Sequence, residues 1–226
     1  MKLLKKWFKK LQTNMGYTLI EVAAVVAVTA TLGAIVVPIA VDKTNQGKVV
    51  AARESTKSIG DAITGFVKDT GNFPAASSGA GSGTTHFAVL RSGAEIGALG
   101  ATHDPIPTGL WTGITAVDVL DNHLTINNPG GTPNTLTPND AYLLVHKFSN
   151  WKGPYSEPFA NFDPWGHNYL VYVKAMHTAT SDTGGDKQYG WILSAGPDGK
   201  LNTNITNSVI QGDDLGYALY SAESTH

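Results

Sequence analysis

Three aspartates near the C-terminal end of the chain have the residue types and the surroundings of a calcium loop. Asp198 lies between Gly196 and Gly199, and the pair Asp213 and Asp214 follows after a further loop. Ca²⁺ takes about six to eight hard oxygen ligands, which come from carboxylates and from backbone carbonyls in a flexible loop. Glycines allow such carbonyls to turn inward. The spacing is not that of an EF-hand, and ordinary turn chemistry at the Asp-Gly and Gly-Asp pairs is the alternative interpretation.

A fourth carboxylate, Glu21, stands at the head of an uncharged apolar run. Residues 22–41 read VAAVVAVTATLGAIVVPIAV, in which two threonines are the only polar side chains. A helix of this length spans about 30 Å, the thickness of a bilayer core. A carboxylate beside hydrocarbon is costly unless it is paired, so Glu21 is a candidate functional residue. A glutamate that only extends outward to the headgroups is the alternative.

Other common chemistries are missing from the sequence. The chain has no cysteine, which excludes a disulfide scaffold, cysteine-ligated metal sites and a thiol nucleophile. The seven histidines show no zinc-binding spacing, and the glycine-rich segment 75–85 lacks the Lys-Ser/Thr of a phosphate-binding loop. The sequence also has no Gly-x-Ser-x-Gly elbow. We therefore expect no enzymatic activity; a membrane-anchored enzyme or carbohydrate-binding module is the alternative from another class.

Charge is distributed unevenly along the chain. The whole chain has 16 basic and 18 acidic residues, but five of the lysines lie in residues 1–16, which contain no acid. The remainder carries a formal charge of −7. An acidic body argues against nucleic acid as a partner. The positive-inside rule places the basic segment in the cytoplasm and the body beyond Asp42 on the other side of the membrane. A secretory signal peptide is the competing interpretation of the apolar run 22–41.

The elements that must position these residues are a long helix and a small sheet. Residues 42–70 contain no proline, and Ile59, Ile63, Phe66 and Val67 form one apolar stripe at helical spacing, before Gly71 ends the helix. Residues 169–174 and 189–194 read as strands. The sequence predicts an α+β fold, with a long N-terminal helix packed on a small antiparallel sheet. Residues 74–140 are expected to form a loop-rich insertion.

The N-terminal residues resemble a known processing site. The string Gly16-Tyr17-Thr18-Leu19-Ile20-Glu21-Val22, after a basic leader, is similar to the site in type IV pilins and pseudopilins. The resemblance implies that a prepilin peptidase cuts between Gly16 and Tyr17 and methylates the new amine of Tyr17. Glu21 is then the fifth mature residue, and would pair with the Tyr17 amine of a neighbouring subunit. Pro38 falls where these proteins often have a helix-weakening proline, either as a mild kink or as a point of local melting.

The C-terminal part resembles one branch of this superfamily. Gly153-Pro154-Tyr155, the string from Asp163 to Tyr169, and the pattern Ser-x-Gly-x-Asp-Gly before Asp213-Asp214 are similar to the major pseudopilins of type II secretion systems. The resemblance implies a bound Ca²⁺ held by the side chains of Asp198, Asp213 and Asp214 and by the carbonyls of Ala195 and Leu201. A metal cross-link would replace the disulfide that this cysteine-free chain cannot form.

The implied function is that of a structural subunit. Residues 1–16 would be the leader, 17–41 the transmembrane or filament-core helix, and 42–226 a periplasmic pilin-like domain. The chain would leave the inner membrane and polymerise into a type II secretion pseudopilus, with prepilin peptidase, the inner-membrane assembly platform, minor pseudopilins and membrane lipid as partners. The alternative is a type IV pilin of an extracellular fibre for adhesion, motility or DNA uptake.

Overall fold

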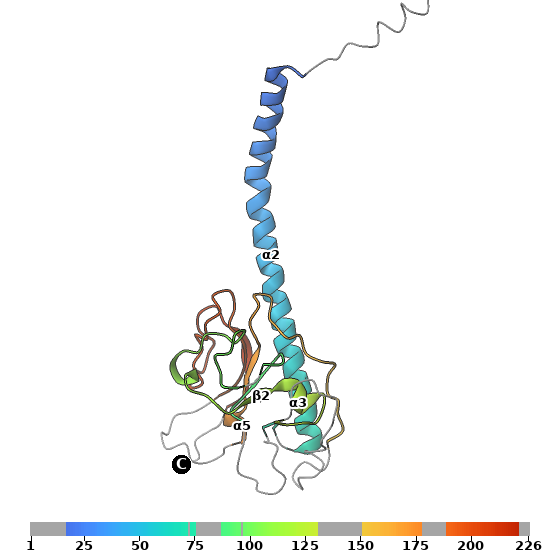
Figure 1. The fold of residues 1–226 in the computed structure, drawn as a ribbon, viewed down its shortest axis with the longest axis vertical. Helices are drawn as coiled ribbons and strands as arrows, with labels where there is room; N and C mark the ends of the chain where they lie inside the picture. Colours follow the sequence, from blue (N-terminus) through green and yellow to red (C-terminus); the bar gives the residue numbers. More distant parts are fainter. Residues whose placement is uncertain are drawn as a thin grey trace, which may run out of the picture. The chain divides into compact units, whose positions relative to one another are not determined.

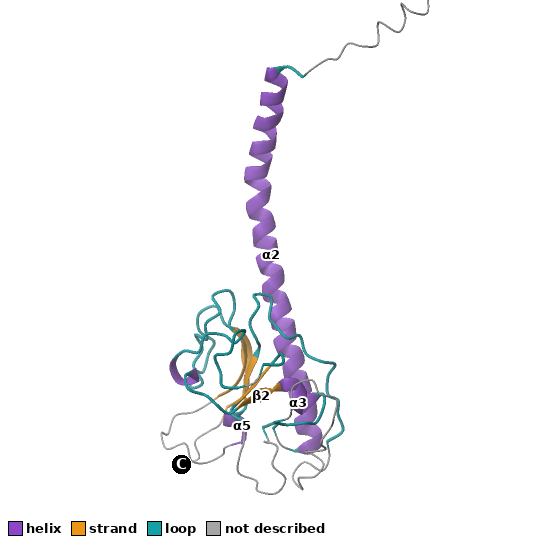
Figure 2. Ribbon diagram, in the orientation of Figure 1, coloured by secondary structure: helices purple, strands orange, loops and turns teal. Residues whose placement is uncertain are grey.

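The computed structural model of the chain describes residues 17–71, 73–75, 87–95, 97–130, 151–177 and 189–221 (Figure 1). Figure 2 distinguishes the helices from the strands. In chain order the elements are α2 (Leu19–Thr70), β1 (Val89–Arg91), η1 (Gly109–Trp111), β2 (Val117–Val119), α3 (Leu120–Leu124), β3 (Leu170–Tyr172), α5 (Lys174–His177), β4 (Tyr189–Ser194) and β5 (Leu215–Ser221).

The chain divides into two compact units, residues 1–46 and residues 47–226. The first unit contains the beginning of α2, and the predicted leader, including Gly16, lies outside the described residues. The second unit contains the rest of α2 and every strand that the structure describes.

Both ends of α2 follow from local sequence. Thr18 and Glu21 form reciprocal hydrogen bonds at the N-terminus, in the Thr-x-x-Glu pattern of a capping box. At the other end, Gly71 has a φ of 71° and donates its amide to the Val67 carbonyl at 2.8 Å. This left-handed conformation costs glycine little and ends the helix, as the sequence predicted.

The second half of α2 packs through its predicted apolar stripe. Ile59, Ile63 and Phe66 are fully buried, and Val67 packs partly buried beside them. They join one core cluster with residues from α3 and from one face of the sheet, which are Leu90, Leu120, Leu124, Tyr169, Val171 and Ile192. The helical spacing therefore identified the buried face of this segment correctly.

The sheet has five strands in the order β2-β1-β3-β4-β5. Three of the four pairings are antiparallel, but β1 pairs with β2 in parallel, with Val89 opposite Val117. The sheet is therefore mixed, whereas the sequence predicted a purely antiparallel sheet. The parallel pairing is possible because the connection 92–116 between β1 and β2 is long, and a parallel pair needs a crossover of about a dozen residues or more. Within the expected insertion 74–140, the described residues supply β1, η1, β2 and α3.

The opposite face of the sheet carries a second core cluster. Neighbouring strand residues alternate between the two clusters, so that Trp191 and Leu193 face away from α2 while Ile192 faces toward it. Trp111 of η1 closes this second cluster together with Leu201 and Ile205 from the loop after β4. The fold is thus α+β, with one long apolar N-terminal helix and a sheet covered on both faces.

Candidate functional site

Glu21 lies in the first turn of α2, and its carboxylate closes the helix N-terminus. Its Oε2 accepts hydrogen bonds from the Thr18 backbone amide and from the Thr18 hydroxyl, both at 2.8 Å. The Glu21 amide in turn donates to the Thr18 hydroxyl at 3.3 Å. These bonds satisfy amides that the first helical turn leaves without intrahelical partners. Glu21 therefore has a local structural role that the sequence interpretation missed, although the pattern Thr-Leu-Ile-Glu was there to indicate it.

The segment of α2 from Leu19 to Val41, apart from Glu21, presents an apolar surface on all sides. Leu19, Ile20 and the apolar side chains up to Val41 are exposed, the largest being 50% or more accessible. This helix is long and apolar enough to span a membrane by length and composition. A helix that is hydrophobic all round has to be covered by lipid or by other protein. The predicted membrane segment thus carries no partner within the chain's described residues.

Pro38 lies inside α2, and the helix continues through it. Proline has no amide hydrogen, so the Ala34 carbonyl loses its usual intrahelical donor at this point. The helix is nevertheless uninterrupted at Pro38.

The two threonines of the apolar run are satisfied within the helix. Thr29 and Thr31 donate their hydroxyls back to carbonyls of the preceding turn, at 2.8–3.0 Å, and so have no need of a polar partner outside the helix.

Two of the three predicted calcium ligands come together in the loop after β4. The Asp198 amide donates to Asp213 Oδ2 at 3.0 Å. The Asn202 side-chain nitrogen lies 3.3 Å from Asp198 Oδ2, 3.2 Å from Asp213 Oδ1 and 3.3 Å from the Lys200 carbonyl oxygen. Three oxygens therefore surround one nitrogen. Hard cations such as Ca²⁺ bind to oxygen clusters of this kind. The sequence interpretation gave Asn202 no role in this cluster.

Asp214 is placed differently from its neighbour Asp213. Its side chain is 3% exposed, and its Oδ2 accepts the Thr203 amide at 2.6 Å. Its Oδ1 is buried and has no hydrogen-bond partner among the described residues. Burial raises the pKa of the Asp214 carboxyl to about 6. A buried carboxylate oxygen without a donor is costly, and a cation would offset that cost.

The two predicted carbonyl ligands lie in buried stretches of the same loop. Ala195 is fully buried directly before Gly196, whose φ is 65°. Leu201 is also fully buried, and its carbonyl already accepts a hydrogen bond from the Thr108 hydroxyl. Among the residues that the structure describes, no group of three or more His, Cys, Asp or Glu side chains is close enough together to hold a metal ion. The structure therefore assembles Asp198 and Asp213, and leaves Asp214 apart from them.

The Asp-Pro-Trp-Gly turn contacts this loop, which the sequence interpretation did not foresee. Asp163 Oδ1 accepts the amides of Trp165 and His167, both at 2.9 Å, so the carboxylate closes its own turn. Asp163 Oδ2 accepts the hydroxyl of Ser194, the last residue of β4, at 2.6 Å. His167 Nδ1 is 4.0 Å from Asp163 Oδ1, and Ser194 is fully buried. This serine donates to an aspartate rather than to a histidine, so the group is not arranged for nucleophilic catalysis.

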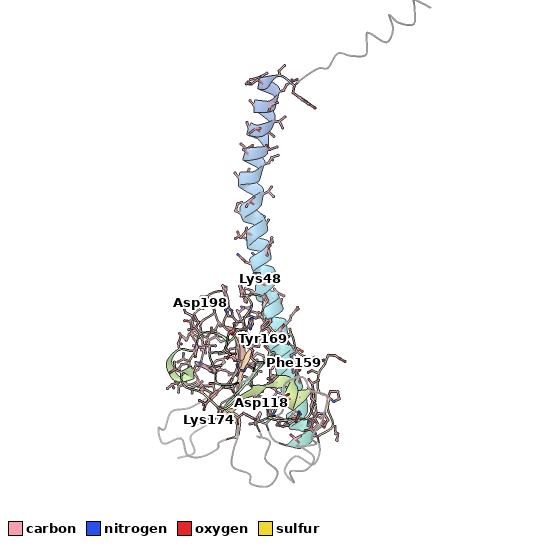
Figure 3. The ribbon with its side chains drawn as sticks, viewed as in Figure 1. Lys48, Asp118, Phe159, Tyr169, Lys174 and Asp198 are labelled. Atoms are coloured by element: carbon pink, nitrogen blue, oxygen red, sulfur yellow. The ribbon has the colours of Figure 1, made fainter. Side chains whose placement is uncertain are left out.

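Two other buried polar groups hold the unit together. Arg91 Nη1 pairs with Asp104 Oδ2 at 2.6 Å, and both side chains are fully buried. Asp104 also accepts the amides of Gly100 and Ala101 and the side-chain amide of Asn168. Elsewhere, His123 Nε2 lies 2.9 Å from Asp118 Oδ2. Figure 3 shows Asp118 and Asp198 well apart in the second unit.

Comparison with known proteins adds no relative. No family model, no curated protein and no solved structure matches the chain.

Proposed function

We propose that this chain is a pilin-like structural subunit that polymerises through its N-terminal helix into a type II secretion pseudopilus. The observation that carries the proposal is the exposed apolar surface of α2 between Leu19 and Val41, which contains one carboxylate, that of Glu21. Such a surface is stable only inside lipid or against other apolar helices. Lipid before assembly and further copies of the same helix after assembly satisfy this requirement in turn.

Glu21 supplies what an apolar bundle lacks, which is a fixed axial register. Cleavage between Gly16 and Tyr17 leaves a charged amine four residues before Glu21. In a staggered stack the Glu21 carboxylate meets the Tyr17 amine of a neighbouring subunit, and each group offsets the desolvation cost of the other. Methylation of that amine retains its charge. Prepilin peptidase, the inner-membrane assembly platform and minor pseudopilins are the partners that this function requires.

Calcium belongs to the same proposal. Asp198 and Asp213 already share one donor, the Asn202 amide, and Asp214 Oδ1 is a buried oxygen in need of a partner. When bound, Ca²⁺ would cross-link the segment after β4 to the segment before β5. Asp198, Asp213 and Asp214 would hold it, with the carbonyls of Ala195 and Leu201. This calcium-type loop is the feature that favours the secretion pseudopilus over an extracellular pilus.

Filament assembly tests the function. We expect Glu21→Val to insert into the inner membrane in the same amount as the wild-type chain, because the substitution only lengthens the apolar run. The variant should yield almost no filament when the assembly system is overexpressed and filaments are sheared and pelleted. A wild-type filament yield from Glu21→Val would contradict the proposal.

Calcium removal tests the second part. The full chain in detergent should melt at a higher temperature in millimolar Ca²⁺ than in chelator, because a ligand that binds only the folded state stabilises it. The double variant Asp198→Asn/Asp213→Asn should lose this shift, while Asp61→Asn, an exposed aspartate on α2, should keep it. An identical melting temperature with and without Ca²⁺ would remove the metal from the proposal.

A further inference from the structure

A pocket of about 390 Å³ lies between α2 and the segment 155–160, within the second unit. Ser55, Ser58 and Ile59 line it from the helix, and the segment 155–160 forms the opposite wall. Tyr169, which Figure 3 labels beside α2, lines it as well and is 1% exposed. The volume falls within the range of about 300–1,000 Å³ that small-molecule sites occupy. None of these residues has a role in the proposed filament function.

The wall opposite the helix is fixed by backbone bonds to α3. The Tyr155 amide donates to the Leu124 carbonyl at 2.8 Å, and the Phe159 amide donates to Asp121 Oδ1 at 3.2 Å. The Tyr155 ring also packs edge-on against Phe66 of α2, with the ring centroids 5.6 Å apart. Because this wall is already ordered, a ligand would not have to bear the entropic cost of ordering it.

Serine hydroxyls supply polar atoms on both sides of the pocket. The Ser55 hydroxyl bonds to that of Tyr169, and Ser58 lies three residues further along the same side of α2. Across the pocket, Ser156 Oγ is buried and has no hydrogen-bond partner among the described residues. A buried hydroxyl without a partner costs free energy, and rotation about χ1 would bring this oxygen to a ligand that offsets the cost.

The charges around the pocket restrict the class of ligand. Among the described residues that line it, none is lysine, arginine or histidine, and Glu157 contributes one exposed carboxylate. Phosphates, nucleotides and acidic peptides are therefore disfavoured, because cationic side chains usually hold such groups. Aromatic walls beside hydroxyls and a carboxylate instead suit a molecule that has one apolar face and many hydroxyl groups. A pyranose sugar has this character, since its C–H groups pack on the electron-rich face of an aromatic ring.

We propose that this pocket binds one ring of a neutral carbohydrate. The sugar hydroxyls bond to Ser58, Ser156 and the Glu157 carboxylate, which accepts hydroxyl donors. The C–H face of the sugar packs against Phe159, whose ring is only partly buried in the core. This binding function goes beyond filament formation and does not depend on it.

Sugar titration of the full chain, in a detergent without a sugar headgroup, tests the proposal. Glucose, galactose, mannose and N-acetylglucosamine are each added at millimolar concentration, and backbone amide shifts are followed by NMR. We expect at least one sugar to shift the amides of Ser156 and Phe159 and to leave that of Ile205, on the other side of the sheet, unchanged. Inorganic phosphate and tetramethylammonium should shift neither pocket amide. Shifts caused by no sugar, or by phosphate or tetramethylammonium instead, would overturn the proposal.

Removing the unpaired hydroxyl separates a binding role from a structural one. Ser156→Ala should weaken sugar binding about tenfold, which is the scale of one hydrogen bond. The same variant should melt at the wild-type temperature or above it, because it deletes a buried hydroxyl that has no partner among the described residues. Ser208→Ala, at an exposed serine outside the pocket, should leave the affinity unchanged. Wild-type sugar affinity in Ser156→Ala, or an equal loss in Ser208→Ala, would contradict the assignment.

Blocking the pocket from the helix side provides a second route. Ser58 is exposed, so Ser58→Trp can fold while its indole fills the space between α2 and the opposite wall. This variant should lose sugar binding altogether. Lys68→Trp, at another exposed position of the same helix, should retain it. Sugar binding that persists in Ser58→Trp would place the sugar elsewhere on the protein and overturn the proposal.

Discussion

Replacing Glu21 with glutamine separates the two roles that the structure and the proposed function give to this residue. In the structure Glu21 accepts two hydrogen bonds from Thr18 and completes the capping box of α2. Glutamine also serves at this position of a capping box, because its side-chain oxygen accepts the same bonds. Glutamine carries no charge, however, and cannot form an ion pair with the Tyr17 amine of a neighbouring subunit.

The two roles differ in magnitude. Losing an N-terminal cap costs about 0.5–2 kcal/mol of local helix stability. Removing one partner of a buried ion pair costs about 3–5 kcal/mol, because the other charge is left buried and uncompensated. At about 1.4 kcal/mol for each factor of ten, this lowers the association constant of each subunit by at least about a hundredfold. Glu21→Gln should therefore retain the helix and fail to assemble.

The assay combines filament yield with helix content. Glu21→Gln should show the wild-type far-ultraviolet circular dichroism in detergent, with sheared filament reduced below about one hundredth of the wild-type amount. Thr18→Ala, which breaks the capping box and leaves the carboxylate, should still assemble. Glu54→Gln controls for the loss of an exposed glutamate on the same helix. Full assembly of Glu21→Gln, combined with failure of Thr18→Ala, would refute the ion-pair role and assign Glu21 to helix capping.

Two further predictions concern the second unit. Asp104→Ala should lower the free energy of unfolding by about 3–5 kcal/mol in denaturant titrations, because it leaves Arg91 buried without its partner. The control is Lys57→Ala, which breaks the pair with Asp61, whose side chains are 73% and 67% exposed. This control should change the free energy of unfolding by at most about 1 kcal/mol. A small effect of Asp104→Ala would show that the site relaxes around the arginine. Burial raises the pKa of Asp118, but the hydrogen bond and charge of His123 and the Gly130 amide outweigh it and hold the pKa below the usual 3.8. Asp118 therefore stabilises the fold above pH 3.8 and loses this contribution as the pH falls through its lowered pKa. Asp118→Asn should therefore reduce the fall in melting temperature between neutral and acid pH. An unchanged fall in melting temperature toward acid pH would contradict this.

The parts that the sequence predicted are those with a local and periodic cause. Helix α2 has a long apolar run, an apolar stripe and a terminal glycine, so its character is readable without knowing its partners. Strand β4 (Tyr189–Ser194) was predicted with its observed bounds, because its six residues form a short unit rich in aromatic and apolar side chains, all buried after Tyr189. The spacing of Ile59, Ile63 and Phe66 likewise fixed the buried face of the helix.

The parts that were missed depend on distant partners. Strand β1 has three residues, which is too short for a period to appear, and its parallel pairing with β2 depends on the crossover between them. Strand β5 was not predicted, since Gly216 interrupts its pattern, although the strand needs that glycine because its backbone lies against the Ile192 carbonyl. The buried partners of Arg91 and Asp163 lie elsewhere in the sequence, and only the fold brings Asp104 and Ser194 against them.

The residue at the mature N-terminus decides whether the chain is processed as a pilin-like subunit. The chain should be recovered from membranes and from sheared filaments of cells that express it with its own processing enzymes, and its N-terminal peptide determined by mass spectrometry. Our account predicts a chain that begins at Tyr17 with a methylated amine, in both fractions. A chain that still begins at Met1, or one cut on the C-terminal side of the apolar run after Val41, would contradict the assignment of this protein as a pilin-like filament subunit.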